Sequence, residues 1–267
     1  MTGTEPPIEP SEPPKPPEPS GPSGPSEPSG LSGPTETSEP SEPSRDPEAR
    51  GGVRLVPALL VLTAIGGLVD AVTFLGLGHV FTANMTGNVV VLGFAAAGAP
   101  GFSVPHTATS LVCFLAGAAI GGRVVRRVGE GSRRTPARVV LAAEALLLAV
   151  SAAVASATSD DAPATVYTII TLTAFAMGLR NATVRKLAVR DLTTTTVVTM
   201  TLTGLASDSR AGGGTGRRSP RRTAAVTAMF SGAVLGAVLV LHNDLAIPLL
   251  LAATTSAVLA LTVSGKE

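Results

Sequence analysis

Charged residues are scarce in this 267-residue sequence. Asp, Glu, Lys and Arg together make up 15% of the chain, whereas about a quarter is usual for a soluble domain. Hydrophobic residues make up 45%, and the mean hydropathy is +0.38. This composition argues against an ordinary soluble enzyme and indicates a membrane protein.

Cysteine and aromatic residues are also rare. The single cysteine, Cys113, excludes an intramolecular disulfide and any metal cluster built from several cysteines. The chain has no Trp and one Tyr, so the usual aromatic belt at the membrane surface is nearly missing. The sequence motifs GxxxxGK[ST], HExxH and GxSxG are absent as well. We therefore expect no enzymatic activity, no cofactor and no metal site.

The first fifty residues differ from the rest of the chain. Residues 1–50 contain 15 of the 22 prolines and 10 of the 19 acidic residues. With almost no apolar side chains to bury, this segment is predicted to be a disordered cytoplasmic tail. The overlapping PxxP spacings at Pro13, Pro16 and Pro19 leave a docking ligand as the alternative to a spacer. Residues 51–267 form the predicted membrane domain, with 17 basic and 9 acidic residues.

Six stretches of the membrane domain are long and apolar enough to cross the hydrocarbon core, which takes about 20 residues. They are residues 56–77, 107–125, 138–157, 164–184, 223–241 and 245–263. Two further stretches, 81–98 and 192–207, are only partly apolar. The first is polar in its first half, and the second contains seven threonines.

The arginines decide how these two stretches are placed, because Lys and Arg collect in cytoplasmic loops. Arginines are dense in the segments after residue 122 and after residue 209, while the loops at 158–163 and 242–244 contain no Lys or Arg. All basic loops lie inside only if stretches 81–98 and 192–207 enter and leave by the same face. The predicted fold is therefore all-α, with six transmembrane helices, two re-entrant segments and both termini in the cytoplasm.

The two halves of the membrane domain resemble each other in sequence. GLVDA at 67–71 matches GLRNA at 178–182, and Phe81-Thr82 matches Leu192-Thr193 at the same offset of 111 residues. A GxxxG pair recurs as Gly117/Gly121 and Gly232/Gly236. The predicted repeats cover about 55–157 and 164–264 and start on opposite sides of the membrane, so they are inverted, as in many secondary transporters.

The stretch GGLVDAVTFLGLGHVFTANMTGN, followed by AFAMGLRNATVRKLAVRDLTTTTVVTMTLTGLASD, resembles the YoaK family of small bacterial multi-pass membrane proteins. The resemblance covers residues 55–265 and leaves out the tail. It implies an integral protein of the bacterial plasma membrane whose activity is not established. It transfers no catalytic residues.

Asp70 is the first candidate for a binding site. A carboxylate inside a membrane segment costs about 2.5–3.5 kcal/mol to insert, so it usually faces the bundle interior or water and has a function. One interpretation is a proton, cation or substrate site. The other is a buried carboxylate that caps a broken helix. The equivalent residue of the second repeat, Asn181, is neutral.

The polar residues of the two re-entrant stretches are further candidates for binding a solute or an ion. Asn84, Thr86 and Asn88 could replace part of a hydration shell, or they could satisfy the backbone of their own broken helix. In the second stretch the candidates are Thr196 and Thr199. Threonines in apolar helices often bond back to the i−4 carbonyl, which is the alternative there.

Four glycines, one acidic residue and the arginine-rich loops give predictions about helix packing and partners. Gly117, Gly121, Gly232 and Gly236 are expected to bring helices close together, within the monomer or across a homodimer. Glu144 is expected to reach the membrane surface, with pairing to Arg138 or Arg180 as the alternative. Anionic lipid head groups are the expected partners of the arginine-rich loops, and nucleic acid is not expected.

Two functions remain open from the sequence. The first is a secondary transporter or channel for a small polar solute or ion, favoured by the inverted repeats and the intramembrane acid. The second is a non-catalytic membrane scaffold or regulator that presents the tail and the basic loops to partners.

Overall fold

Helices make up the regular structure of the described residues. The computed structural model describes residues 48–128, 134–158, 162–187, 198–214 and 219–262. A boundary after residue 45 divides the chain into two units, and all described residues belong to the second. Their helices are α1 (Glu48–Gly76), α2 (Met85–Ala96), α3 (Val104–Val128), α4 (Arg134–Ala157), α5 (Pro163–Leu187), α6 (Val198–Ser207), the 3₁₀-helix η2 (Arg210–Gly212), α7 (Ser219–His242) and α8 (Ala246–Thr262).

Proline marks the start of five of these helices. It occupies one of the first three positions of α3, α4, α5, α7 and α8, as Pro105, Pro136, Pro163, Pro220 and Pro248. The first turn of a helix leaves its N–H groups unbonded, so the missing N–H of proline costs nothing there. The turns that follow α1 and α2 contain Gly78 and Gly98 with φ of 83° and 79°, which suits glycine.

Four of the described helices are long and apolar enough to cross a membrane. The spans are Pro57–Gly76 of α1, Val104–Val128 of α3, Thr135–Ala157 of α4 and Pro220–His242 of α7. The stretches expected at 164–184 and 245–263 correspond to α5 and α8, which are not among the four. α5 contains Arg180, Arg185 and Lys186, and α8 has 17 residues. All-α structure and several membrane-spanning helices are thus confirmed, while the number six is not.

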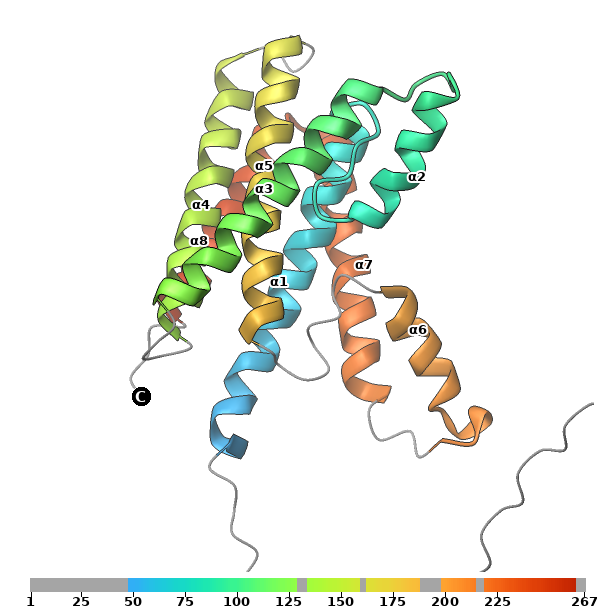
Figure 1. The fold of residues 1–267 in the computed structure, drawn as a ribbon, viewed down its shortest axis with the longest axis vertical. Coiled ribbons are helices and arrows are strands. Elements are labelled where there is room, and N and C mark those ends of the chain that lie inside the picture. Colours follow the sequence, from blue (N-terminus) through green and yellow to red (C-terminus); the bar gives the residue numbers. More distant parts are fainter. Residues whose placement is uncertain (1–47, 129–133, 159–161, 188–197, 215–218, 263–267) are drawn as a thin grey trace, which may run out of the picture. The chain divides into compact units, whose positions relative to one another are not determined.

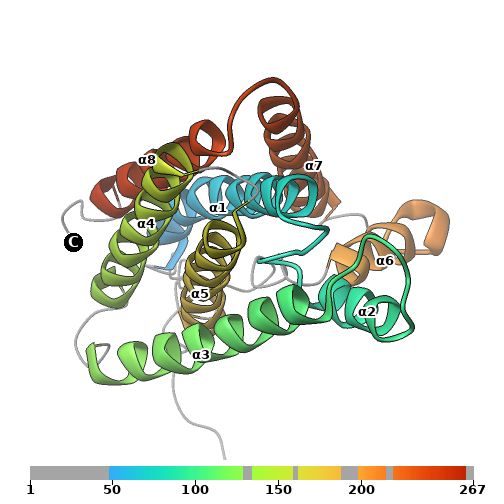
Figure 2. The same ribbon diagram turned by 90° about the horizontal axis from the view of Figure 1, so that it is seen from above.

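The long helices pack as three pairs: α1 with α7, α3 with α5, and α4 with α8. Figure 2 shows α1 between α7 and α5, with α4 and α8 side by side. Fully buried side chains such as Leu148, Ile170, Met177 and Leu249 fill the space between the helices. Only 11% of the most apolar stretch of α7 is buried. Its exposed apolar surface suits lipid and not water.

Two short helices lie at the side of this bundle. α2 has 12 residues and packs on α3, and α6 has 10 residues and packs on α7. In Figure 1 the chain leaves the top of α1, turns back down, and returns upward as α2 before α3 begins. Figures 1 and 2 place α2 and α6 on the same side of the bundle, and each helix begins at the end nearer the other. Neither helix is long enough to span a bilayer.

Glycines let two of the helix pairs approach closely. A Cβ atom at Gly117 would overlap the carbonyl oxygen of Phe175, and one at Gly121 would lie 2.7 Å from that of Leu179. In the α1–α7 pair a Cβ at Gly232 would overlap the Ala64 carbonyl oxygen, and one at Gly236 would lie 2.5 Å from that of Leu68. All four glycines therefore act within the monomer, at contacts where no larger residue fits without moving a helix.

Gly232→Ala is expected to weaken the α1–α7 contact, because its Cβ would overlap backbone atoms of Ala64. Overpacking of this kind costs about 1–3 kcal/mol, so the melting temperature of the purified protein in detergent should fall. Circular dichroism measures it. Gly93→Ala in α2 is the matched control, since its Cβ would meet no atom within 4 Å. Equal melting temperatures for the two variants would contradict the close approach.

Candidate functional site

Asp70 lies on α1 and is 5% exposed. Its Oδ1 accepts hydrogen bonds from the backbone N–H groups of Thr82 at 2.9 Å, Ala83 at 2.7 Å and Asn84 at 3.4 Å. These three residues immediately precede α2, and Asn84 is its N-cap. A carboxylate from α1 therefore binds backbone N–H groups of the turn that leads into another helix.

Two asparagines hold the same turn. Asn84 is the N-cap of α2, and its side chain accepts from the Gly87 N–H at 3.3 Å. Asn88 is fully buried, accepts from Phe81 N–H at 2.9 Å, and donates to the Phe81 carbonyl at 2.6 Å. Ser110 of α3 donates to that carbonyl at 2.6 Å and accepts from Asn88 at 3.1 Å. The two amides thus satisfy the backbone of their own broken segment, which is one of the two interpretations of the sequence.

The remaining candidates lie apart from this cluster. Thr86 is exposed, and Asn181 is half-buried within α5, which runs without a break from Pro163 to Leu187. Thr196 and the side chain of Thr199 lie outside the described residues. The structure therefore brings together Asp70, Asn84 and Asn88 and leaves Thr86 and Asn181 out of their hydrogen bonds.

A buried ion pair joins α4 and α5. Nη1 of Arg180 lies 3.0 Å from Oε1 of Glu144, with the two residues 5% and 0% exposed. The hydroxyl of Ser256 on α8 donates to the same Oε1 at 3.2 Å. The expectation that Glu144 reaches the membrane surface is wrong, because its partner lies inside the bundle. A buried charge is tolerated when it is paired and hydrogen-bonded.

Arg180 also connects this pair with α1. Its Nη2 lies 3.1 Å from the position that a Cβ at Gly66 would occupy, and Gly66 lies one helical turn before Asp70 on α1. We name Asp70, Glu144 and Arg180 the buried charge cluster. Oδ2 of Asp70 and Oε2 of Glu144 are buried without a hydrogen-bond partner among the described residues.

Sequence reasoning names Arg180 only as one of two alternative partners of Glu144 and does not select it as a site residue. The signal was nevertheless present. Arg180 follows an apolar run, and Glu144 lies in another. Two opposite charges inside apolar runs are cheapest to bury when they contact each other.

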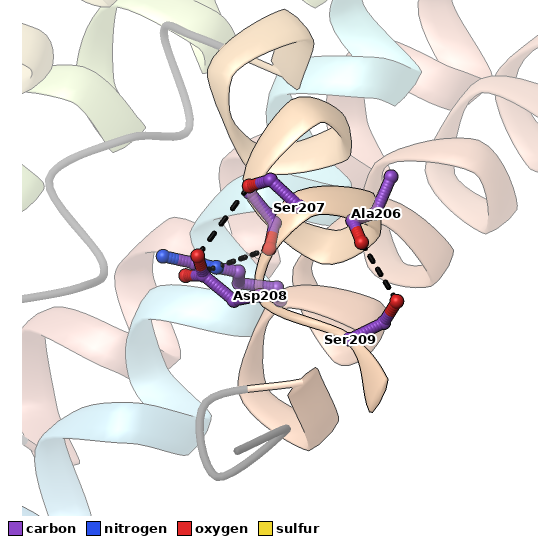
Figure 3. A network of polar contacts seen from close by, with 6 residues as sticks. Ala206, Ser207, Asp208 and Ser209 are labelled. Carbon is purple, nitrogen blue, oxygen red and sulfur yellow. Dashed lines mark hydrogen bonds and ion pairs between the residues drawn. The ribbon is translucent and has the colours of Figure 1, made fainter. Parts of the chain in front are cut away.

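A second polar cluster lies at the end of α6 (Figure 3). Arg222 of α7 donates to the Gly204 carbonyl and to Oδ2 of Asp208, both at 2.6 Å. The Ser209 hydroxyl donates to the Ala206 carbonyl at 2.7 Å. A cation at the last carbonyls of a helix stabilises its negative end. The side chain of Asp208 is 53% exposed. This cluster therefore links the C-terminal end of α6 to α7 at the protein surface and is not a buried site.

No group of three or more His, Cys, Asp or Glu side chains that could hold a metal ion occurs among the described residues. The buried charge cluster contains two carboxylates on different helices with a guanidinium beside them. An arrangement of this kind is suited to binding a proton or a small polar group rather than to enclosing a metal ion.

These features define a multi-pass α-helical membrane protein with charged residues in its interior. The family model described as "Protein of unknown function (DUF1275)" matches residues 58–262, and the chain belongs to this family. The chain is 36% identical to the UPF0700 transmembrane protein YoaK of Bacillus subtilis (strain 168) over 151 residues, and the match covers 57% of this chain. The matched part spans 64% of the length of that relative. No solved structure matches the chain.

Asn88→Ala is expected to loosen the turn before α2, because the Phe81 N–H loses its acceptor and the Phe81 carbonyl loses one of two donors. The loss should be about 1–3 kcal/mol. Hydrogen–deuterium exchange read by mass spectrometry should show faster exchange in residues 77–84. The control is Thr86→Ala, which changes an exposed side chain on the same helix. Unchanged exchange in Asn88→Ala would refute the role of this side chain.

Proposed function

We propose that this protein is a secondary transporter or channel for a small polar solute or ion in the bacterial plasma membrane. The observation that carries the proposal is Asp70. It lies in a membrane-spanning helix, where one carboxylate oxygen binds the turn before the short helix α2 and the other has no hydrogen-bond partner among the described residues. Intramembrane acids of this kind usually mark a solute or ion pathway. Broken helices near mid-depth are typical of transporter binding sites.

The proposed architecture is two inverted repeats of three spans, with α5 and α8 added to the other four as the fourth and sixth spans in chain order. Its support is the equivalence of the two glycine contacts. The α1–α7 contact involves Ala64, Gly67, Leu68, Met229, Gly232 and Gly236; adding 111 to the α1 numbers and subtracting 115 from the α7 numbers gives the residues of the α5–α3 contact, Phe175, Gly178, Leu179, Phe114, Gly117 and Gly121. Six equivalences at two constant offsets are hard to obtain without a repeat.

In this arrangement the first long helix of each repeat packs on the second long helix of the other repeat. The two pairs are α1 with α7 and α5 with α3. α4 and α8 then face each other as equivalent helices, and the short helices α2 and α6 approach from opposite ends on one side of the bundle (Figures 1 and 2). Interlocked repeats of this kind provide two similar halves that can rock against each other to give alternating access.

The proposed orientation places both termini in the cytoplasm. Basic residues gather at the C-terminal ends of α3 and α5, which include Arg126, Arg127, Arg185 and Lys186. These two ends lie together, since Lys186 donates to the Gly122 carbonyl at 3.1 Å. In the proposed orientation they face the cytoplasm, where anionic lipid head groups are the proposed partners.

Cysteine labelling tests this orientation. In a Cys113→Ala background, Pro100→Cys between α2 and α3 and Asn243→Cys between α7 and α8 should react in whole cells with a maleimide that does not cross membranes. Ala211→Cys in η2 should react only after the membrane is permeabilised, because the basic ends face the cytoplasm. Protection of Pro100→Cys in whole cells would mean that residues 81–98 cross the membrane, and the inverted arrangement would be rejected.

Asp70→Asn tests the function itself. The replacement keeps the size and an oxygen acceptor but removes the charge, and it makes the first repeat match Asn181 of the second. We expect it to abolish or strongly reduce flux in a liposome screen of ions and small metabolites, while the protein still inserts and folds.

The matched control is Asp244→Asn, the same chemical change on an exposed residue between α7 and α8. It should leave flux at the wild-type level. If no solute in the screen moves through the wild-type protein, the proposal fails. The scaffold then becomes the preferred function. If Asp70→Asn transports as well as the wild type, Asp70 is not the site.

A further inference from the structure

The buried charge cluster contains two acidic groups and one basic group. Asp70, Glu144 and Arg180 are each at most 5% exposed, and they come from α1, α4 and α5. With both carboxylates ionised, the cluster would leave one negative charge uncompensated inside a membrane-spanning bundle. An uncompensated charge is strongly unfavourable in a low-dielectric interior, and one bound proton removes it.

We infer that the buried charge cluster is a proton-binding site, with the proton held on Oδ2 of Asp70 and the Glu144–Arg180 pair acting as its charge-balancing partner. Two observations place the proton on Asp70. Glu144 already has a direct cation at 3.0 Å and a hydroxyl donor on the same oxygen, which favours its ionised form. Asp70 has no ion-pair partner among the described residues: Oδ1 accepts only from neutral backbone N–H groups, and Oδ2, like Oε2 of Glu144, has no hydrogen-bond partner there.

The protonated form fits the observed hydrogen bonds. When a proton binds, an O–H bond forms at Oδ2, and Oδ1 remains a carbonyl oxygen that still accepts from Thr82 and Ala83. The cluster is then electrically neutral: one ion pair and one neutral acid. When the proton leaves, Asp70 becomes a second anion for which Arg180 is the available cation.

A metal cation fits the same place poorly. The oxygen of Asp70 that faces the turn is surrounded by backbone N–H groups, whose hydrogens repel a cation. Na⁺, Ca²⁺ and Mg²⁺ need several oxygen ligands, and the described residues bring no third acidic group to the cluster. Among the described residues, the α7 atoms against Gly67 belong to Met229 and Ala233, and α8 contributes Ser256, so neither of these contacts brings a charge.

Proton coupling of flux would rest on the proposed transport function, but occupancy of the proton site does not. Infrared spectroscopy of the purified full-length protein at neutral pH tests occupancy without a transport assay. A protonated carboxyl group has a carbonyl stretching band, which shifts in D₂O and is separate from the bands of carboxylates. Labelling all aspartates with ¹³C at the side-chain carboxyl should shift the band, and labelling glutamates should not.

Variants test the charge balance. Asp70→Asn should remove the band. Glu144→Gln should also remove it, although it changes a different carboxyl group, because Arg180 then has only Asp70 as its anion. The double variant Glu144→Gln with Arg180→Gln should restore the band, since no cation remains to ionise Asp70. Asp244→Asn, which alters an exposed carboxyl group, should leave the band unchanged.

The outcomes separate the two proposals. A wild-type protein without the band, or a band that responds to glutamate labelling, overturns the proton site on Asp70. A band that survives Glu144→Gln, or fails to return in the double variant, overturns the charge-balancing role of the pair. A band without flux in liposomes retains the proton site and rejects transport, whereas flux without the band retains transport and rejects the proton site.

Discussion

The rest of the structure depends on a requirement of the membrane interior: polar groups buried there must find partners within the chain. Asp70 meets this requirement for the turn before α2, since Oδ1 accepts from the backbone of Thr82 and Ala83. Asn88 and Ser110 meet it for Phe81. A short helix, α2, can therefore begin directly after this turn, at the side of the bundle.

Close contacts between helices also hold the bundle together. Lipid tails are as apolar as leucine, so helices in a membrane gain little from apolar burial alone and depend on tight packing. Glycines supply it here by letting backbone meet backbone, at Gly117 against Phe175 and at Gly232 against Ala64. The contacts join α3 to α5 and α1 to α7, so segments far apart in the sequence are held together without large side chains.

The charged residues differ between the two halves of the proposed repeat. At the positions 111 residues apart, Asp70 corresponds to Asn181 and Val69 corresponds to Arg180. Glu144 contacts Ser256, which lies on α8, the helix that faces α4. Under the proposed repeat, each charge therefore has no charged counterpart in the other half. The two glycine contacts form between backbones and involve no charge, whereas the ion pair and Asp70 make the interior of the bundle asymmetric.

The sequence by itself determined the class of the protein, the apolar helices and the family, because these follow from local composition and from motifs such as GLVDA and MTGN. It also singled out Asp70, since an acid in an apolar run is costly wherever the run lies. Only the tertiary structure decided that Asn84 and Asn88 bind their own backbone and that Glu144 turns inward to Arg180. Those partners lie on other turns and helices, up to 36 residues away for the ion pair, and sequence spacing does not specify which side chains meet when helices pack.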